Sequence, residues 1–420
     1  MAIGLKLKEK QPSQVEFQNG QSRLKIETIS MEKVMQTRFK LLGSTALAAS
    51  ALVIGASAAS ADGHKALEKR IKAIEATNNQ QVTRAKKTMS LTVSGHVARN
   101  ISFSDNGTDS GILHTTNALS QTRVRWVGKG TINDDWSVMT NIEMGNNTQT
   151  SSQQDVTDQA DVNGTALTDR FSEIRLISKS LGTIYIGQGA VGADGVSESD
   201  LSGTGFVALP GSSGVGGGAE FWQSNGASIG VTANSTFSNF DSLGRQGRLR
   251  YDTPSFGGFQ VTASHGNKDQ STVALRYGGS MGGVSVKAAL GYTNDGISSS
   301  TTITNGSVSV LLPMGLSVSL GASERNTDAA ATEGSWRYGK IGYKFKGSEL
   351  GDTRLWAEYN YNEDVVALND EAEYYSAGVI QIVEPLGMEL FLKHINLDLD
   401  RPGTATEDID TTSVGIRVSF

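Results

Sequence analysis

Cysteine is absent from this sequence of 420 residues, and proline and charge are scarce, with six prolines and 19% charged residues. A chain without cysteine has neither a disulfide framework nor a thiolate metal site, and it suits an oxidising compartment. The five histidines show no H-x-x-x-H or H-E-x-x-H spacing, so we expect no metal centre and no cofactor. The formal net charge of −6 argues against nucleic acid as the main partner.

Long hydrophobic runs are also missing after residue 61. No later apolar stretch approaches the ~20 residues that a transmembrane helix needs. Two classes of protein remain. One is a water-soluble secreted protein, and the other is a transmembrane β-barrel, whose alternating strands escape hydropathy analysis.

The N-terminal region predicts a processing signal. Arg38 and Lys40 precede a run rich in alanine and leucine, and Ala59-Ser60-Ala61 fits an A-x-A cleavage site. We therefore expect a signal peptide over 35–61, preceded by an upstream extension over 1–34; a membrane anchor is the alternative.

The segment 62–90 carries a short helical pattern. Leu67, Ile71 and Ile74 share one helical face, but the pattern ends within two turns. This favours a short periplasmic helix or tether, with a trimeric coiled coil as the alternative.

Glycine is abundant, with 49 residues, and Gly187, Gly189 and Gly192 match G-x-G-x-x-G after a strand-like run. A dinucleotide site needs a helix that begins at the last glycine and a βαβ unit around it. The following residues have no helical period and contain further glycines. We interpret the motif as the exit of a strand into a loop.

From Leu91 onward, the hydrophobic period is two. Val124 and Trp126 alternate with Arg123 and Arg125, as expected for a strand with one apolar and one polar face. The same pattern predicts sixteen strands: 91–103, 121–129, 136–143, 169–179, 183–188, 245–252, 257–265, 270–278, 283–294, 302–312, 315–324, 334–346, 352–363, 370–384, 387–399 and 410–420.

The links between these strands alternate between short turns and long polar loops, including predicted loops over 104–120 and 189–244. A soluble sandwich has no reason to place its short links at one end, whereas an outer-membrane barrel does. The predicted fold is therefore all-β, a sixteen-stranded antiparallel transmembrane β-barrel over 91–420 with a long loop folded into the pore. One predicted strand, 387–399, breaks the alternation at Phe391 and Leu392, and a bulge or a subunit contact would explain it.

The stretch RLRYDTPSFGGFQVTAS resembles the Y-x-S/T-P-x-F-x-G-F turn of the Gram-negative general porin family, through Tyr251, Pro254, Phe256 and Phe259. SLGTIYIGQG and SQTRVRWVGKG resemble two further strands of that family, and Phe420 matches its C-terminal aromatic residue. The resemblance covers roughly 91–420. One departure is the lack of the P-E-F-G-like element that the family's third loop usually carries.

The resemblance implies a water-filled outer-membrane channel for passive diffusion of ions and small hydrophilic solutes, and not an enzyme. It also implies a homotrimer, contacts with outer-membrane lipid and lipopolysaccharide, and recognition of Phe420 by the barrel assembly machinery. The nearest alternative is a substrate-specific outer-membrane channel. A barrel enzyme or an adhesin is a more distant alternative.

Selectivity in such a channel comes from charges at a constriction. We expect the loop over 189–244 to narrow the pore with acidic residues that face arginines on the polar faces of the strands. These predicted constriction residues are Asp194, Glu198, Asp200, Arg123, Arg125, Arg175, Arg248 and Arg250. Alternatively, the arginines only solvate the lumen and pair with neighbours such as Glu143 and Glu173.

Overall fold

The computed structural model describes residues 89–157, 159, 167–212, 214–296, 301–327 and 333–420. The predicted extension over 1–34, the predicted signal peptide over 35–61 and almost all of the predicted tether over 62–90 lie outside these residues. None of the helices in the described part of the chain is long and apolar enough to span a membrane.

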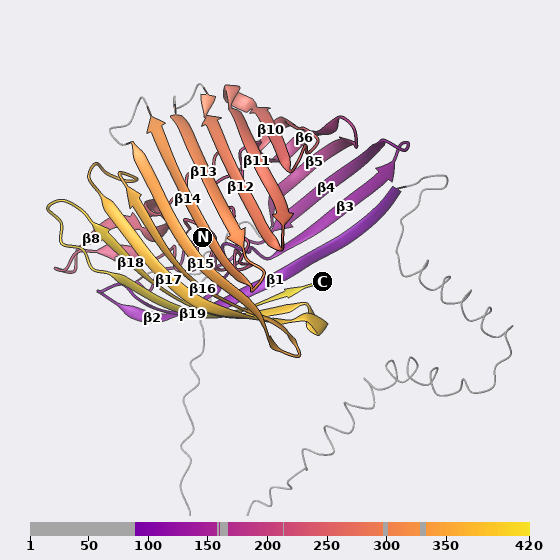
Figure 1. Ribbon diagram of the computed structural model, residues 1–420. Coiled ribbons are helices and arrows are strands. Elements are labelled where there is room, and N and C mark those ends of the chain that lie inside the picture. Colours follow the sequence, from indigo (N-terminus) through magenta and orange to yellow (C-terminus); the bar gives the residue numbers. More distant parts are fainter. Residues whose placement is uncertain (1–88, 158, 160–166, 213, 297–300, 328–332) are drawn as a thin grey trace, which may run out of the picture. The chain divides into compact units, whose positions relative to one another are not determined.

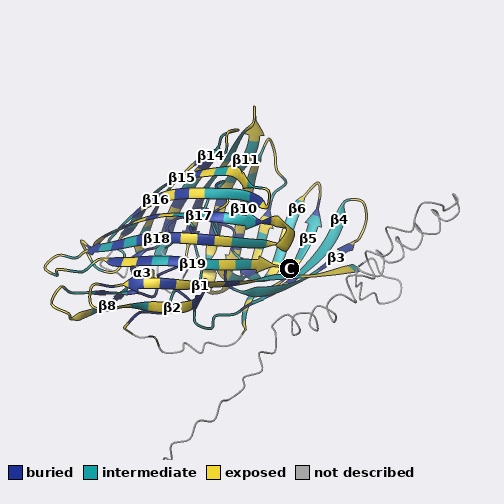
Figure 2. Ribbon diagram, turned by 90° about the horizontal axis from the view of Figure 1, so that it is seen from below, coloured by how far each residue is buried: buried dark blue, intermediate teal, exposed yellow. Residues whose placement is uncertain are grey.

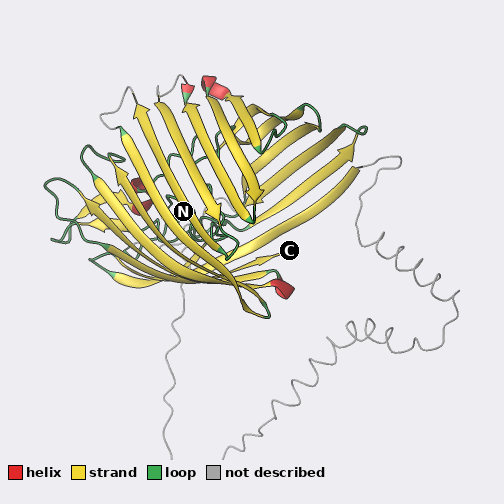
Figure 3. Cartoon of the chain, viewed as in Figure 1, coloured by secondary structure: helices red, strands yellow, loops and turns green. Residues whose placement is uncertain are grey.

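Strands make up most of the described chain, and the helices are single turns (Figures 1 and 3). The elements are β1 (Met89–Asp105), β2 (Ser110–Thr116), β3 (Arg123–Thr131), β4 (Trp136–Gly145), β5 (Thr168–Ser178), β6 (Gly182–Ala190), β7 (Glu220–Trp222), β8 (Ser228–Thr232), α3 (Ala233–Thr236), β9 (Arg245–Asp252), β10 (Phe259–Gly266), η1 (Asn267–Asp269), β11 (Ser271–Met281), β12 (Val284–Asn294), β13 (Thr301–Leu311), β14 (Leu316–Thr327), β15 (Gly334–Ser348), β16 (Gly351–Glu363), β17 (Glu371–Val383), η3 (Glu384–Leu386), β18 (Met388–Asp400) and β19 (Ile409–Ser419).

The large sheet closes on itself into an antiparallel barrel. Neighbouring strands pair in chain order, β6 pairs with β9, and β19 pairs with β1. β2 and β3 share one position, because β1 pairs with β3 over Met89–His96 and with β2 over Arg99–Asp105. The barrel therefore has sixteen strand positions, as the sequence predicts. The predicted loop over 104–120 is wrong in one respect, since it contains β2.

The links confirm the predicted alternation. Short links join β3 to β4, β5 to β6 and β11 to β12, whereas the long link 191–244 joins β6 to β9 at the opposite end. We call these the turn end and the loop end of the barrel. Each of the sixteen positions of the ring is paired on both sides over part of its length, whereas β2 by itself pairs only with β1. Such closure is what a sheet in hydrocarbon requires.

Each strand has two different faces (Figure 2). On β1, the side chains of Val97 and Ile101 are exposed, whereas those of Asn100 and Ser102, at alternate positions, are buried. In a closed barrel, the exposed apolar residues form the outer face and the alternating polar residues form the inner face. Inner-face side chains on neighbouring strands bond to one another, as Ser102 Oγ does to Ser413 Oγ at 2.7 Å.

The last residue takes part in closing the barrel. The backbone of Phe420 exchanges two hydrogen bonds of 3.0 Å with Gly95 on β1. A side chain at Gly95 would collide with the Phe420 ring, because a Cβ there would lie 2.7 Å from the ring Cζ. Gly95 thus leaves space for the terminal aromatic ring on the outer face.

Candidate functional site

Six arginines lie close together on one side of the inner face, on β3, β5 and β9. We call this group the arginine wall: Arg123, Arg125, Arg170, Arg175, Arg248 and Arg250. Five of them are predicted constriction residues. Alternation places them inward, as Leu249 between the two arginines of β9 is 56% exposed on the outer face.

Glu143 on β4 lies at the centre of the β3 and β5 arginines. Its carboxylate contacts Arg123 Nη1 at 3.3 Å, Arg170 Nε at 2.7 Å and the guanidinium of Arg125. The Glu143 side chain is fully buried by these contacts. A buried carboxylate surrounded by three guanidinium groups is fully paired, and it leaves excess positive charge toward the lumen.

Glu173 has the same role for the arginines of β5 and β9. It contacts Arg175 and Arg248, each at 2.5 Å. The ring of Tyr185 on β6 lies beneath the guanidinium groups of Arg175, Arg248 and Arg250, at 5.1, 5.7 and 5.1 Å. Stacking on this aromatic face, together with their carboxylate partners, holds the three arginines in a fixed orientation.

Arg170 is the member of the wall that sequence alternation misses. The residue count from Arg175 would place it outward. However, the pairing of β4 with β5 shifts between Glu143 and Met144, and Arg170 is the extra residue on β5. A bulge of one residue redirects the side chain, and here it turns Arg170 toward Glu143.

Glycines allow the chain to leave β6. Gly187 has φ +121°, and a Cβ there would lie 2.3 Å from the backbone oxygen of Ser172. A Cβ at Gly189 would collide with Glu173 Oε2 at 2.5 Å. The next helix, α3, begins only at Ala233. The motif therefore serves a close-packed strand exit and not a nucleotide-binding helix.

The described residues between 191 and 244, which we call the inner segment, contact the inner face of successive strands, except for the exposed turn at 224–228 between β7 and β8. The backbone N–H of Gly192 donates to Ser264 Oγ on β10 at 2.9 Å, and that of Leu201 donates to Ser309 Oγ on β13 at 3.0 Å. Small hydroxyl side chains on these strands thus satisfy a loop backbone that has no sheet partner.

Two buried lysines hold the next part of the inner segment. Lys340 Nζ on β15 donates to Ala208 O at 2.5 Å and to Asp200 Oδ2 at 2.9 Å, and Lys393 Nζ on β18 donates to Val207 O at 3.0 Å. Burial opposes ionisation of Asp200, but the Lys340 ammonium holds the pKa of that carboxyl below its usual range. β15 lies eight positions from β5 around the ring, so Asp200 is paired on the side away from the arginine wall.

Apolar residues of the inner segment pack against β17 and β18. Phe206 meets Phe391 edge to face, with ring centroids 5.9 Å apart, and Phe237 meets Tyr374 in the same way at 5.2 Å. Phe391 therefore faces inward and Leu392 outward, in an unbroken register with β17 and β19. The predicted bulge is therefore wrong, and the inner segment, which covers the inner face of this strand, accounts for Phe391. The predicted subunit contact stays a prediction.

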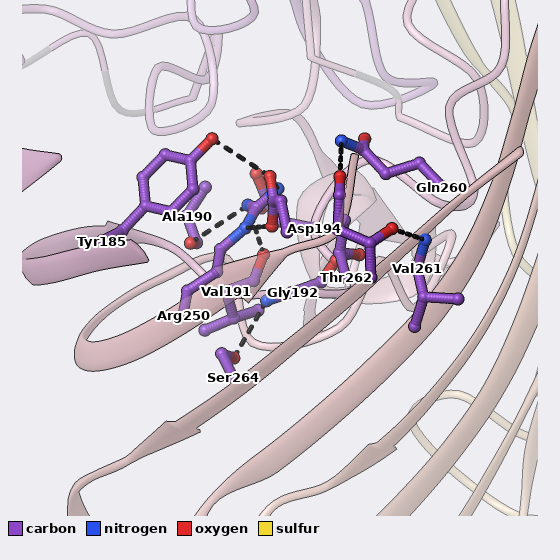
Figure 4. A network of polar contacts seen from close by, with 12 residues as sticks. Tyr185, Ala190, Val191, Gly192, Asp194, Arg250, Gln260, Val261, Thr262 and Ser264 are labelled. Carbon is purple, nitrogen blue, oxygen red and sulfur yellow. Dashed lines mark hydrogen bonds and ion pairs between the residues drawn. The ribbon is translucent and has the colours of Figure 1, made fainter. Parts of the chain in front are cut away.

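Asp194 lies on the part of the inner segment near the arginine wall, and Figure 4 shows it beside Arg250. Glu198 lies further along the segment, where the backbone N–H of Ser199 donates to Ser307 Oγ on β13. Burial and the nearby Asp241 carboxylate raise the pKa of Asp194 to about 6. Burial, Asp241 and Asp194 together raise the pKa of Glu198 to about 8. Asp241 accepts hydrogen bonds from the backbone N–H groups of residues 195 and 197. Because the pKa values of Asp194 and Glu198 are raised, this cluster of three carboxyl groups gains negative charge as pH rises.

Among the predicted constriction residues, the structure thus brings Arg250 and Asp194 together, places the other four arginines on the same wall, and separates Asp200 from them. Arg276 on β11 was not predicted, although alternation places it inward. Its guanidinium donates to Asp194 O at 2.7 Å. Within the described ranges, no group of three or more His, Cys, Asp or Glu side chains is placed to hold a metal ion.

A sequence model of Gram-negative porins matches residues 45–383. The chain belongs to the Gram-negative porin family. A search of curated proteins found no match. As a porin with a closed barrel, the protein is a passive channel of the outer membrane.

Solved structures share the porin fold at low sequence identity. An anion-selective porin from Comamonas acidovorans is 18% identical, with TM-score 0.56, over 79% of this chain and all of that chain. OmpF of Salmonella typhi, in complex with daunomycin, is 14% identical, with TM-score 0.54, over 79% of this chain and 98% of that chain. The trimer form of in-vitro folded OmpT, an outer membrane protein of Vibrio cholerae, is 14% identical, with TM-score 0.53, over 79% and 100%.

Proposed function

We propose that this porin is a general channel with a preference for anions, whose narrowest passage lies between the arginine wall and the inner segment. The observation that carries the proposal is the wall itself. Its six guanidinium groups share three carboxylates, of Glu143, Glu173 and Asp252. The acids Asp194 and Glu198 of the inner segment have raised pKa values, so they offset this positive charge only in part near neutral pH.

Opposite charges on the two sides of the passage would also act on the solutes that cross it. A unit charge a few Å from a permeating ion interacts with it by a few kcal/mol at an effective dielectric of ~20. Salt screens this interaction over about 10 Å at 0.1 M ionic strength. Arginines on one side and carboxylates on the other would orient small dipolar solutes as they pass.

Planar-bilayer recordings test the proposal and its nearest alternative. A general channel has a conductance that rises linearly with KCl, whereas a substrate-specific channel has a conductance that saturates with its solute. In a salt gradient, Arg123→Ser combined with Arg125→Ser should shift the zero-current potential toward cations, more strongly at 0.1 M than at 1 M salt. The matched control is Arg99→Ser, because Arg99 is exposed on the outer face. A normal conductance with an unmoved reversal potential in the double variant would remove these residues from the constriction.

A catalytic function has no comparable support. Gly278, Ser280 and Gly282 match the G-x-S-x-G motif of serine hydrolases, but they lie where β11 turns directly into β12. The Oγ of Ser280 bonds to Ser285 Oγ at 2.8 Å. A serine-hydrolase nucleophile instead occupies a strand-to-helix turn.

The remaining expectations concern assembly and orientation. We infer a homotrimer, which is supported by the family and by the trimer form of the related fold. We also infer contacts with lipid and lipopolysaccharide, a cleaved signal peptide over 35–61 and recognition of Phe420 by the barrel assembly machinery. Deleting Phe420 should lower the yield of heat-modifiable barrel in the outer membrane, and an unchanged yield would remove its role as a signal.

The loop end should face the cell exterior. Because the chain has no cysteine, single cysteines can report its orientation. Thr404→Cys should react with an impermeant maleimide on intact cells, and Asp134→Cys should not. Labelling at Asp134 in place of Thr404 would invert the topology.

A further inference from the structure

The outer face of β12–β15 contains a hollow of about 620 Å³. Leu290, Val308 and Leu320 form its apolar sides, and all three are exposed. Its floor is formed by Gly306 and Ala322, which are direct partners across β13 and β14. Two adjacent positions with almost no side chain, between larger apolar neighbours, make the depression.

One cation borders the hollow. Arg337 on β15 is the direct partner of Ala322, and it is exposed on the outer face. Its guanidinium lies over the ring of Tyr361, 5.8 Å from the ring centroid. No ion pair in the described part of the chain includes Arg337, and its five N–H donors keep their capacity for a planar, two-oxygen acceptor.

The polar residues of the hollow lie toward the loop end. Thr304 and Glu324 are cross-strand partners one row beyond Gly306 and Ala322, and both line the hollow. The long axis therefore runs from an apolar part near Leu320 to a polar part near Arg337. The carboxylate of Glu324 repels an anion at the β14 side of the hollow. An anionic group is therefore best placed between Arg337 and Tyr361.

A second hollow on the outer face provides a contrast. It measures about 510 Å³ and includes Arg99. The guanidinium of Arg99 donates to Thr116 Oγ1 at 2.5 Å, so this arginine has a hydrogen-bond partner on the neighbouring strand β2. Among the described residues, the guanidinium of Arg337 contacts only the ring of Tyr361. The outer face of the barrel lies in a membrane, where a cation without a charged partner has a high free-energy cost.

We propose that the hollow over Gly306 and Ala322 binds one acyl chain of a lipid in the leaflet at the loop end, and that the phosphate of this lipid accepts two hydrogen bonds from Arg337. The volume lies within the ~300–1,000 Å³ of ordinary ligand sites. The guanidinium matches phosphate geometry, and the apolar sides match a hydrocarbon chain. The site is independent of the pore, because its side chains lie on the opposite face of the sheet.

Native mass spectrometry of the full barrel in nonionic detergent tests this site. The probes are dipalmitoyl phosphatidylglycerol, a neutral glycosyl diacylglycerol with the same chains, and glycerol phosphate without chains. We expect saturable binding of the first probe only. Equal binding of the neutral lipid would overturn the phosphate contact, and binding of glycerol phosphate alone would overturn the role of the hollow.

Matched variants locate the site. Arg337→Gln and Ala322→Leu should each weaken phosphatidylglycerol binding about tenfold, by removing a charge-assisted contact and by filling the hollow. Glu324→Gln should strengthen binding, since it removes a repulsive carboxylate. The controls are Arg99→Gln for charge and Ala377→Leu for size, because Ala377 is a small exposed residue on β17 outside the hollow. Conductance checks that each variant forms a barrel.

Two results would overturn the proposal. One is unchanged lipid binding by both Arg337→Gln and Ala322→Leu in barrels of normal conductance. The other is dissociation of the oligomer in Ala322→Leu, which would show that a second copy of this chain covers the hollow.

Discussion

The two sides of the barrel interior are built differently. The inner face of β3–β9 keeps arginines and carboxylates that pair with each other, whereas the inner face of β10–β18 is covered by the inner segment. On the first side, Glu143 and Glu173 are bonded to arginines of the strands β3, β5 and β9. On the second side, Lys340 and Lys393 are bonded to a loop. The difference teaches that the interior of one barrel carries both a surface of paired charges and a surface that anchors the inner segment.

The largest expected effect is on the anchored side. Lys340→Met should destabilise the barrel by roughly 4 kcal/mol, because it leaves the buried carboxylates of Asp200 and Glu358 without their cation. The temperature of the heat-modifiability shift on a gel measures this. Lys344→Met on the same strand is the control. If both variants melt together, the ammonium of Lys340 does not anchor the inner segment.

A smaller effect should separate the two faces of β18. Phe391→Ala should cost about 3 kcal/mol through the cavity beside Phe206. Leu392→Ala should cost less, because that side chain is 44% exposed on the outer face. Thermal unfolding in detergent measures both. Equal losses would mean that the inner segment does not cover β18 in the folded protein.

Charge removal should separate the two sides by function. Arg175→Gln on the arginine wall, whose side chain is 27% exposed, should shift the reversal potential toward cations, because removing a charge near a permeating ion changes its energy by a few kcal/mol at an effective dielectric of ~20. Arg325→Gln on β14, whose guanidinium is stacked on Phe240 of the inner segment at 4.8 Å, should leave it nearly unchanged. A larger shift in Arg325→Gln would place the ion path along the covered side.

The smallest expected effect is a pH dependence. The pKa values of Asp194, about 6, and Glu198, about 8, are raised, so both groups are neutral at pH 5 and charged at pH 9. Anion preference should therefore fall as pH rises through this window. The same sign applies to stability, since ionising carboxyls whose folded pKa is raised weakens the folded state.

Reversal potentials between pH 5 and 9 measure the selectivity. Asp194→Asn combined with Glu198→Gln should flatten the profile, and Asp155→Asn, outside the inner segment, should not. A profile that keeps its slope in the double variant would assign the titration to other groups.

Sequence reasoning identified most of the fold because a half-buried strand needs a period of two. The strands around Arg123 and Arg125 and around Leu249 follow this rule, so their faces could be assigned without coordinates. The three glycines after Thr183 marked the strand exit for a similarly local reason, since only glycine tolerates the approach of Ser172 O at Gly187.

The sequence by itself determined the number of strand positions in the barrel, their faces, the alternation of turns and loops, and most of the arginines that point inward, because these depend on near neighbours along the chain. The tertiary structure alone decided three further points. A bulge turns Arg170 inward, the inner segment makes Phe391 a buried residue, and Lys340 pairs with Asp200 across 140 positions of sequence. Each of these depends on a contact between distant segments, and such contacts follow from how the barrel closes and not from any local period.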